Sequence, residues 1–175
     1  MSEQPLSDLP ISLERDVFLR TLLRYLAGSL EEVIGLDDAS GFISYVGQQM
    51  GDDIDQTYRQ AIGASQLTRS EVAAVLVDLK QRIQGDFYIV SEDDNKIVLA
   101  THSCPFGDKV KGRPSLCMMT SNVFGTISAN NLGYAKVVLN ETIANGYAGC
   151  LVTVHLKQGM LADKDDGNEY FRGTP

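Results

Sequence analysis

The spacing of apolar residues changes near residue 86, and this change limits the chain to a fold in which helices precede strands. Before it, apolar residues recur every three or four positions, as in Leu19, Leu22, Leu23 and Leu26, which is the period of an amphipathic helix. After it come short runs rich in β-branched and aromatic residues, beginning at 87–90. A chain of 175 residues with this order predicts one α+β domain.

Residues 12–85 are expected to form the helical N-terminal part, after a flexible lead at 1–11. The first helix should follow an N-cap at Ser12 and end near Gly35. Two shorter helices are predicted over 39–50 and 54–62, because Gly51 interrupts the pattern. The sequence Thr-Arg-Ser-Glu at 68–71 is a capping box and predicts a helix that stops at Gly85.

The α/β part is expected over 86–158, so that residues 12–158 form one domain. Runs at 87–90 and 97–100 predict one hairpin, and runs at 136–139 and 151–156 predict a second. Between them, Pro114 starts a helix that reaches about Asn131. The predicted fold is an antiparallel four-stranded sheet of two hairpins packed on this central helix. Residues 159–175 are polar and predict a tail or linker.

Charge and hydropathy exclude several partners. The formal net charge of −8 disfavours nucleic acid and anionic membrane surfaces, because both need clustered lysine and arginine. No apolar run approaches the roughly 20 residues of a membrane-spanning helix. The N-terminal residues have neither the basic region nor the apolar core of a secretion signal, so a cytoplasmic location is expected.

Three cysteines, Cys104, Cys117 and Cys150, are the residues with the most chemical potential. Each lies beside a predicted structural boundary, but their spacing is not that of a zinc finger, so the fold would have to assemble any site. An odd number of cysteines in a reducing compartment argues against structural disulfides. The alternatives are a metal site, a redox-sensitive thiol pair, or simple packing of small apolar side chains.

Other candidates are few. Met118 and Phe124 lie on the helix that carries Cys117, and with Phe106 they are candidates for lining a ligand pocket. His155 follows Val154 in a predicted strand, where successive side chains point to opposite faces, so His155 is expected to face solvent. Nucleophile-elbow, phosphate-loop, dinucleotide and zinc-protease motifs are missing from the sequence. We therefore expect a protein that is not an enzyme.

Four segments of the second half resemble the methanogen output domain: 104–107, 114–117, 133–137 and 146–150. That group is related to the four-vinyl-reductase sensor domain and, more distantly, to subunits of the TRAPP vesicle-tethering complex. The resemblance implies a ligand-sensing α/β domain that is commonly a homodimer and is attached to a signalling output. Separately, the apolar stripe of the first helix is typical of core packing, but it also suits a dimer interface.

The resemblance also implies a zinc site. Sensor relatives use a cysteine on the central helix, a glutamate and a cysteine in the next strand, and a cysteine after a glycine turn. Cys117 and Cys150 match the first and last of these, whereas the middle cysteine position falls on Thr142 and the nearest carboxylate is Glu141.

Cys104 is expected to supply the thiolate that Thr142 lacks in this predicted site. Glu141 or His102 is the expected fourth ligand. Zinc, iron or an iron–sulfur cluster would each suit such donors.

The sequence thus predicts a cytoplasmic sensor whose three-cysteine cluster binds a metal or an iron–sulfur cluster, or senses thiol oxidation. It would act through a signalling partner or a fused output domain and is expected to bind a small-molecule ligand. One alternative is an adaptor or scaffold subunit whose cysteines only pack. Another is a small enzyme acting on an aromatic or tetrapyrrole-like substrate.

Overall fold

Three helices form the first half of the structure, which is a computed structural model that describes residues 14–173. They are α1 (Arg15–Ile34), α2 (Leu36–Ile62) and α3 (Arg69–Arg82). The predicted lead at 1–11 and the N-cap at Ser12 lie outside the described residues. Gly35 separates α1 from α2 with a φ of 85°, a backbone conformation that glycine adopts without steric cost.

The prediction of two helices between 39 and 62 was wrong, because α2 runs unbroken through Gly51. That glycine serves close packing instead of ending the helix. A Cβ atom at Gly51 would lie 2.8 Å from the Cβ of Thr126 on a neighbouring helix. The capping box at the start of α3 is confirmed: the Thr68 hydroxyl accepts a hydrogen bond from the Glu71 amide, and the Glu71 carboxylate accepts one from the Thr68 amide.

The sheet has five antiparallel strands in the order β1-β2-β4-β3-β5. The strands are β1 (Tyr88–Glu92), β2 (Lys96–Thr101), β3 (Tyr134–Glu141), β4 (Cys150–His155) and β5 (Asn168–Phe171). The two predicted hairpins are confirmed as β1–β2 and β3–β4, and they join through pairing of β2 with β4.

The sequence analysis predicted four strands, whereas the sheet has five. Residues 159–175 were expected to be a tail or linker, yet they contain the short helix α5 (Met160–Asp163) and the edge strand β5. Tyr170 on β5 explains why this polar segment pairs with the sheet. Its ring packs directly over Gly125, and its hydroxyl lies 2.9 Å from the Ser121 hydroxyl.

His155 is buried, contrary to the expectation that it faces solvent. Its Nε2 lies 2.7 Å from an Asp165 carboxylate oxygen, in the segment between α5 and β5. The chain after β4 folds back over this part of the sheet, which the alternation of strand residues did not reveal.

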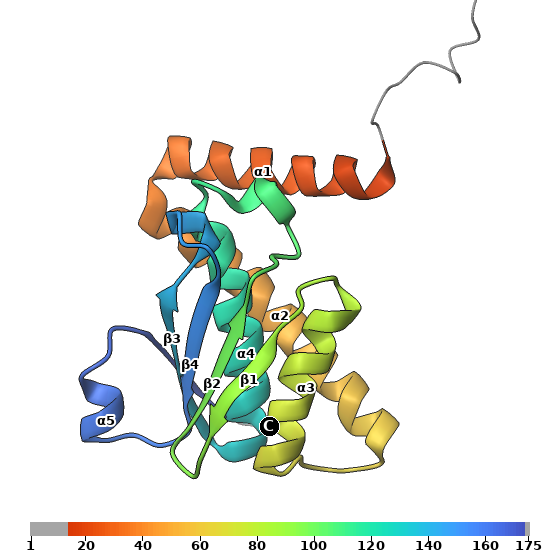
Figure 1. Cartoon of the computed structure of the whole chain (residues 1–175), viewed down its shortest axis with the longest axis vertical. Coiled ribbons are helices and arrows are strands. Elements are labelled where there is room, and N and C mark those ends of the chain that lie inside the picture. The colour runs from red at the N-terminus through yellow and green to blue at the C-terminus, as the bar shows by residue number, and fades with distance from the viewer. Residues whose placement is uncertain (1–13, 174–175) are drawn as a thin grey trace, which may run out of the picture.

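Helix α4 (Cys117–Leu132) lies between the sheet and α2, with α3 beside it (Figure 1). Phe124 is fully buried on α4, and its ring meets the Phe87 ring edge to face at 5.6 Å between centres. The main core combines apolar residues of α3, α4 and the three inner strands, including Leu76, Leu79, Ile97, Leu99, Val123, Ile127, Val137, Val152 and Val154.

Helix α1 runs across one end of the sheet, over the loop that joins β2 to α4 (Figure 1). That loop contains two short 3₁₀ helices, η2 (Gly107–Val110) and η3 (Pro114–Leu116). The Arg24 guanidinium donates hydrogen bonds of 2.6 and 2.8 Å to the carbonyls of Lys109 and Lys111. Within residues 14–173, the helices are all too short or too polar to cross a membrane.

Candidate functional site

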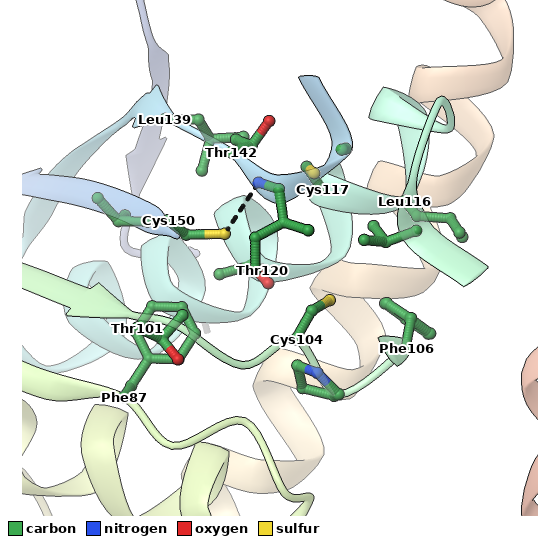
Figure 2. A pocket seen from close by; sticks show the side chains of 15 residues that line it. Phe87, Thr101, Cys104, Phe106, Leu116, Cys117, Thr120, Leu139, Thr142 and Cys150 are labelled. Carbon is green, nitrogen blue, oxygen red and sulfur yellow. Dashed lines mark hydrogen bonds between the residues drawn. The ribbon is translucent and has the colours of Figure 1, made fainter. Parts of the chain in front are cut away.

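All three cysteines line one pocket at the end of the sheet that α1 covers (Figure 2). Cys104 lies in the loop after β2, Cys117 is the first residue of α4, and Cys150 is the first residue of β4. The register Thr101↔Cys150 between β2 and β4 brings the first and third segments together. The cysteines are free thiols, and each is partly buried.

The rest of the pocket wall is largely apolar. It is formed by Phe87, Pro105, Phe106, Val110, Leu116, Leu139, Ile143, Ala144 and Val152, with three threonines among them, Thr101, Thr120 and Thr142. Several of these residues come from η3 and from η4 (Ile143–Asn145). The free space for the centre of a water-sized sphere is about 30 Å³. That is room for about two water molecules, so the pocket suits a small ligand unless its wall moves.

Burial holds two of the thiols, Cys104 and Cys117, in their protonated form. Burial, followed by repulsion from the other two cysteines, raises the pKa of Cys117 to about 12. Burial also raises the pKa of Cys104. The Cys150 sulfur accepts a hydrogen bond from the Ile143 amide at 3.4 Å, drawn as the dashed line in Figure 2. Because the thiolate is the nucleophile and the metal ligand, the thiols of Cys104 and Cys117 are poorly reactive at neutral pH.

Lys80 on α3 is the functional candidate that the sequence analysis missed. It is only 4% exposed, and its Nζ donates a 2.8 Å hydrogen bond to the hydroxyl of Thr120. The ammonium also lies 5.5 Å from the ring centre of Phe87 and 5.2 Å from that of Phe124. Thr120 and Phe87 line the pocket, so the charge lies directly behind its wall.

The position of Lys80 was signalled by helical spacing. Val72, Leu76 and Lys80 are four residues apart and therefore lie on one face of α3, the face that packs into the core. Burial lowers the pKa of Lys80 to about 8, and the nearby cysteines act in the opposite direction. A lysine on an apolar stripe was the available clue.

The predicted fourth metal ligands do not join the cysteines. Glu141 is exposed at the end of β3, and its carboxylate does not line the pocket. His102 is also exposed, and its ring lies beside that of Tyr88, with ring centres 6.4 Å apart. His102 and Cys104 share a separate, open surface hollow instead.

The described part of the chain holds no group of three or more cysteine, histidine, aspartate or glutamate side chains that could bind a metal ion. The three thiols therefore line a common pocket without forming a ready metal centre. Zinc, iron and an iron–sulfur cluster stay predictions, and so does reversible thiol oxidation.

The three residues predicted to line a ligand pocket lie in different places. Phe106 lines the three-cysteine pocket. Phe124 lies in the main core, beneath the pocket residue Phe87. Met118 packs into a second, smaller apolar cluster that includes Ala27 of α1 and Leu116 of η3.

Helix α1 also fixes the outer wall of the pocket. The Ser115 hydroxyl donates a 2.5 Å hydrogen bond to the Glu31 carboxylate, which lies 3.4 Å from the Arg113 guanidinium. The Arg113 guanidinium packs so closely on Gly28 that a Cβ atom there would lie 2.8 Å from it. A movement of α1 would therefore reach η3 and the adjoining Cys117.

Residues 22–155 match the family described as methanogen output domain 1, from α1 to the last residue of β4. The chain belongs to this family. The match includes all three cysteines and Lys80, whereas α5 and β5 follow it. No curated protein matches the chain.

Among solved structures, the domain is similar to subunit 3 of a trafficking protein particle complex from Naegleria fowleri, in a structure covalently bound to palmitic acid. The TM-score is 0.56 with 12% sequence identity, over 81% of this chain and 96% of that chain. At this identity the similarity shows a shared fold, and the neighbour is a subunit of the complex that the sequence analysis named.

Proposed function

We propose that this methanogen output domain is a non-catalytic sensor module in signalling, and that its three-cysteine pocket receives the signal. The observation that carries the proposal is the convergence of all three cysteines on one pocket with largely apolar walls. Membership of an output-domain family supports a role in signalling. Ligands are recognised in concave, mostly apolar sites with a few placed polar groups, and the pocket has this character.

The connection from the pocket to a partner is expected to run through α1. Glu31 contacts Ser115 and Arg113, and these residues flank the start of η3, which leads directly into Cys117. A ligand that displaces this wall would change how α1 lies on the domain. The signal would then be read by a signalling protein or a fused output domain.

We consider three classes of signal for this pocket. A small molecule would need little movement of the pocket wall if it has only a few atoms. A covalent acyl group on one cysteine is suggested by the palmitic acid bound to the trafficking subunit. A zinc ion, iron ion or iron–sulfur cluster would need the thiols to lose their protons and a fourth ligand to approach, and oxidation to a disulfide would need two of them to come together.

The deciding experiment is intact-protein mass spectrometry, elemental analysis and an ultraviolet–visible spectrum on anaerobically purified full chain. Cys104→Ala, Cys117→Ala and Cys150→Ala are compared with Met160→Ala, a change of an exposed sulfur-containing residue outside the pocket. We expect a bound species that Cys→Ala changes weaken or abolish and Met160→Ala leaves intact.

The species found identifies the signal. Stoichiometric zinc or iron would identify a metal, an added acyl mass would identify a thioester, and a released small molecule would identify a reversible ligand. Protein that carries nothing, whose cysteines stay unmodified after peroxide treatment, and whose thermal unfolding no added small molecule shifts, would overturn the sensor proposal.

A second candidate is a scaffold subunit, because α1 and α2 expose many large apolar side chains. Those on α1 are Phe18, Leu19, Leu22, Leu23, Tyr25, Leu26 and Val33, and those on α2 are Leu36, Phe42, Tyr45, Val46, Met50 and Ile62. Such a concentration exceeds the scattered apolar residues of ordinary surfaces and is typical of an interaction site. The occupant that we propose is a second copy of the chain.

We expect Leu22→Glu combined with Leu26→Glu to convert a dimer into a monomer, because the two side chains lie one turn apart on α1 and buried carboxylates without partners are costly. Light scattering coupled to size-exclusion chromatography measures the molar mass. The control is Leu161→Glu, an exposed leucine on α5, outside the two helices. A monomeric wild type would contradict the homodimer.

A further inference from the structure

Lys80 has no anionic partner among residues 14–173, although it is the most deeply buried lysine described. Its contacts are one hydroxyl and two aromatic rings, all neutral. An ammonium group taken out of water is costly unless a negative charge compensates it. The fold therefore keeps a buried positive charge that lacks a counter-charge of its own.

The groups beside this charge face the three-cysteine pocket, and they are better donors than acceptors. The Thr120 oxygen accepts the hydrogen bond from Lys80, so its own O–H is free to donate. The thiols of Cys104 and Cys117 are protonated and act as weak donors. The Thr101 hydroxyl donates instead to the Gly85 carbonyl. No carboxylate lines the described pocket.

We infer that the pocket binds a small monocarboxylate, whose negative charge is neutralised by Lys80 and whose carboxylate accepts a hydrogen bond from the Thr120 hydroxyl. This inference rests on the proposed function, because it names the class of ligand that the pocket receives. The apolar residues Leu116, Ile143 and Val152 would surround a short hydrocarbon tail. The free space holds about two water molecules, so the wall must widen to admit the tail, and a ligand of few carbon atoms needs the least widening.

The test compares carboxylates with their neutral amides, which have nearly the same shape. The full chain is titrated at pH 7 and constant ionic strength with acetate, propionate and butyrate, and in parallel with acetamide, propionamide and butyramide. Dissociation constants come from nuclear magnetic resonance shifts of labelled protein, and thermal unfolding gives an independent measure. We expect the carboxylate to bind about tenfold more tightly than the matched amide, or better, as a hydrogen bond to a charged group implies.

Two variants and one control test whether the preference for carboxylates over amides comes from the buried charge of Lys80. Lys80→Met removes the charge and keeps an unbranched side chain, and Thr120→Val removes the hydroxyl at nearly constant volume. Lys164→Met removes an exposed lysine after α5 and is the control. The carboxylate preference should disappear in Lys80→Met, decrease in Thr120→Val and persist in Lys164→Met.

The inference is overturned if amides bind as tightly as carboxylates, if neither class binds, or if Lys80→Met keeps the preference. Circular dichroism establishes that Lys80→Met is folded, and if it is not, Thr120→Val decides. The result is independent of the cysteine experiment. A metal, acyl group or other ligand found on purified protein and lost in the cysteine variants would uphold the sensor proposal while the carboxylate inference failed.

Discussion

Replacing Phe124 with alanine should lower the free energy of unfolding by about 3–5 kcal/mol, the range for large-to-small changes of buried aromatic residues. Phe124 is fully buried on α4 and packs edge to face on Phe87. Its removal leaves a cavity between the helix layer and the sheet, beneath the pocket. It also takes away one of the two rings that face the Lys80 ammonium. Urea unfolding measured by circular dichroism gives the change.

The matched control is Phe171→Ala on β5. Phe171 is 59% exposed and contacts the Tyr134 ring at 5.5 Å between ring centres. We expect this change to cost less than about 1.5 kcal/mol, since it loses mainly one aromatic contact. Equal losses for the two phenylalanines would contradict the packing described for α4.

Replacing Lys80 with methionine should raise the stability of the ligand-free protein at pH 7 by up to about 3 kcal/mol. Burial lowers the pKa of Lys80 from 10.5 to about 8, and each pKa unit corresponds to about 1.4 kcal/mol. The substitution removes a buried charge and fills similar space with an apolar chain. Urea unfolding in carboxylate-free buffer at pH 7 and pH 9.5 measures the effect.

The pH dependence of the Lys80 effect has a definite sign. Between about pH 8 and pH 10.5, unfolded wild-type chains hold a proton on Lys80 that folded chains lack, so wild-type stability rises with pH in this window. The advantage of Lys80→Met should therefore shrink at pH 9.5. Lys164→Met should show no such trend. A Lys80→Met protein less stable than wild type at pH 7 would mean that the contacts with Thr120 and the two rings outweigh the cost of burial.

The α+β class, the capping box of α3 and the two hairpins could be predicted because each depends on local pattern. Glycine was the weaker guide: Gly35 ends α1, whereas Gly51 lies within α2 because Thr126 packs against it. Strand β5 was missed for a similar reason. Its place in the sheet depends on Tyr170 packing over Gly125, a contact between residues far apart in the sequence.

The candidate site was predicted in part. Cys104, Cys117 and Cys150 line one pocket, while the metal site or thiol switch expected from them stays a prediction. Glu141 and His102 lie close to cysteines in the sequence but outside this pocket, because the direction of a side chain at a strand end is set by sheet register. The apolar stripe of α3 marks Lys80 as buried, but only the three-dimensional structure places this lysine behind the pocket wall.

The order of elements along the chain determines when this domain can fold. Helix α2 packs mainly on α4, and β4 is the central strand that joins the two hairpins. The first two helices thus emerge from the ribosome long before the surfaces that cover them. Strand β2 must also wait for β4, some 50 residues later in the chain, before it gains its inner neighbour. Contacts of such long sequence separation slow folding. During synthesis, the face of α2 that packs on α4 therefore stays uncovered until residue 132 has been made.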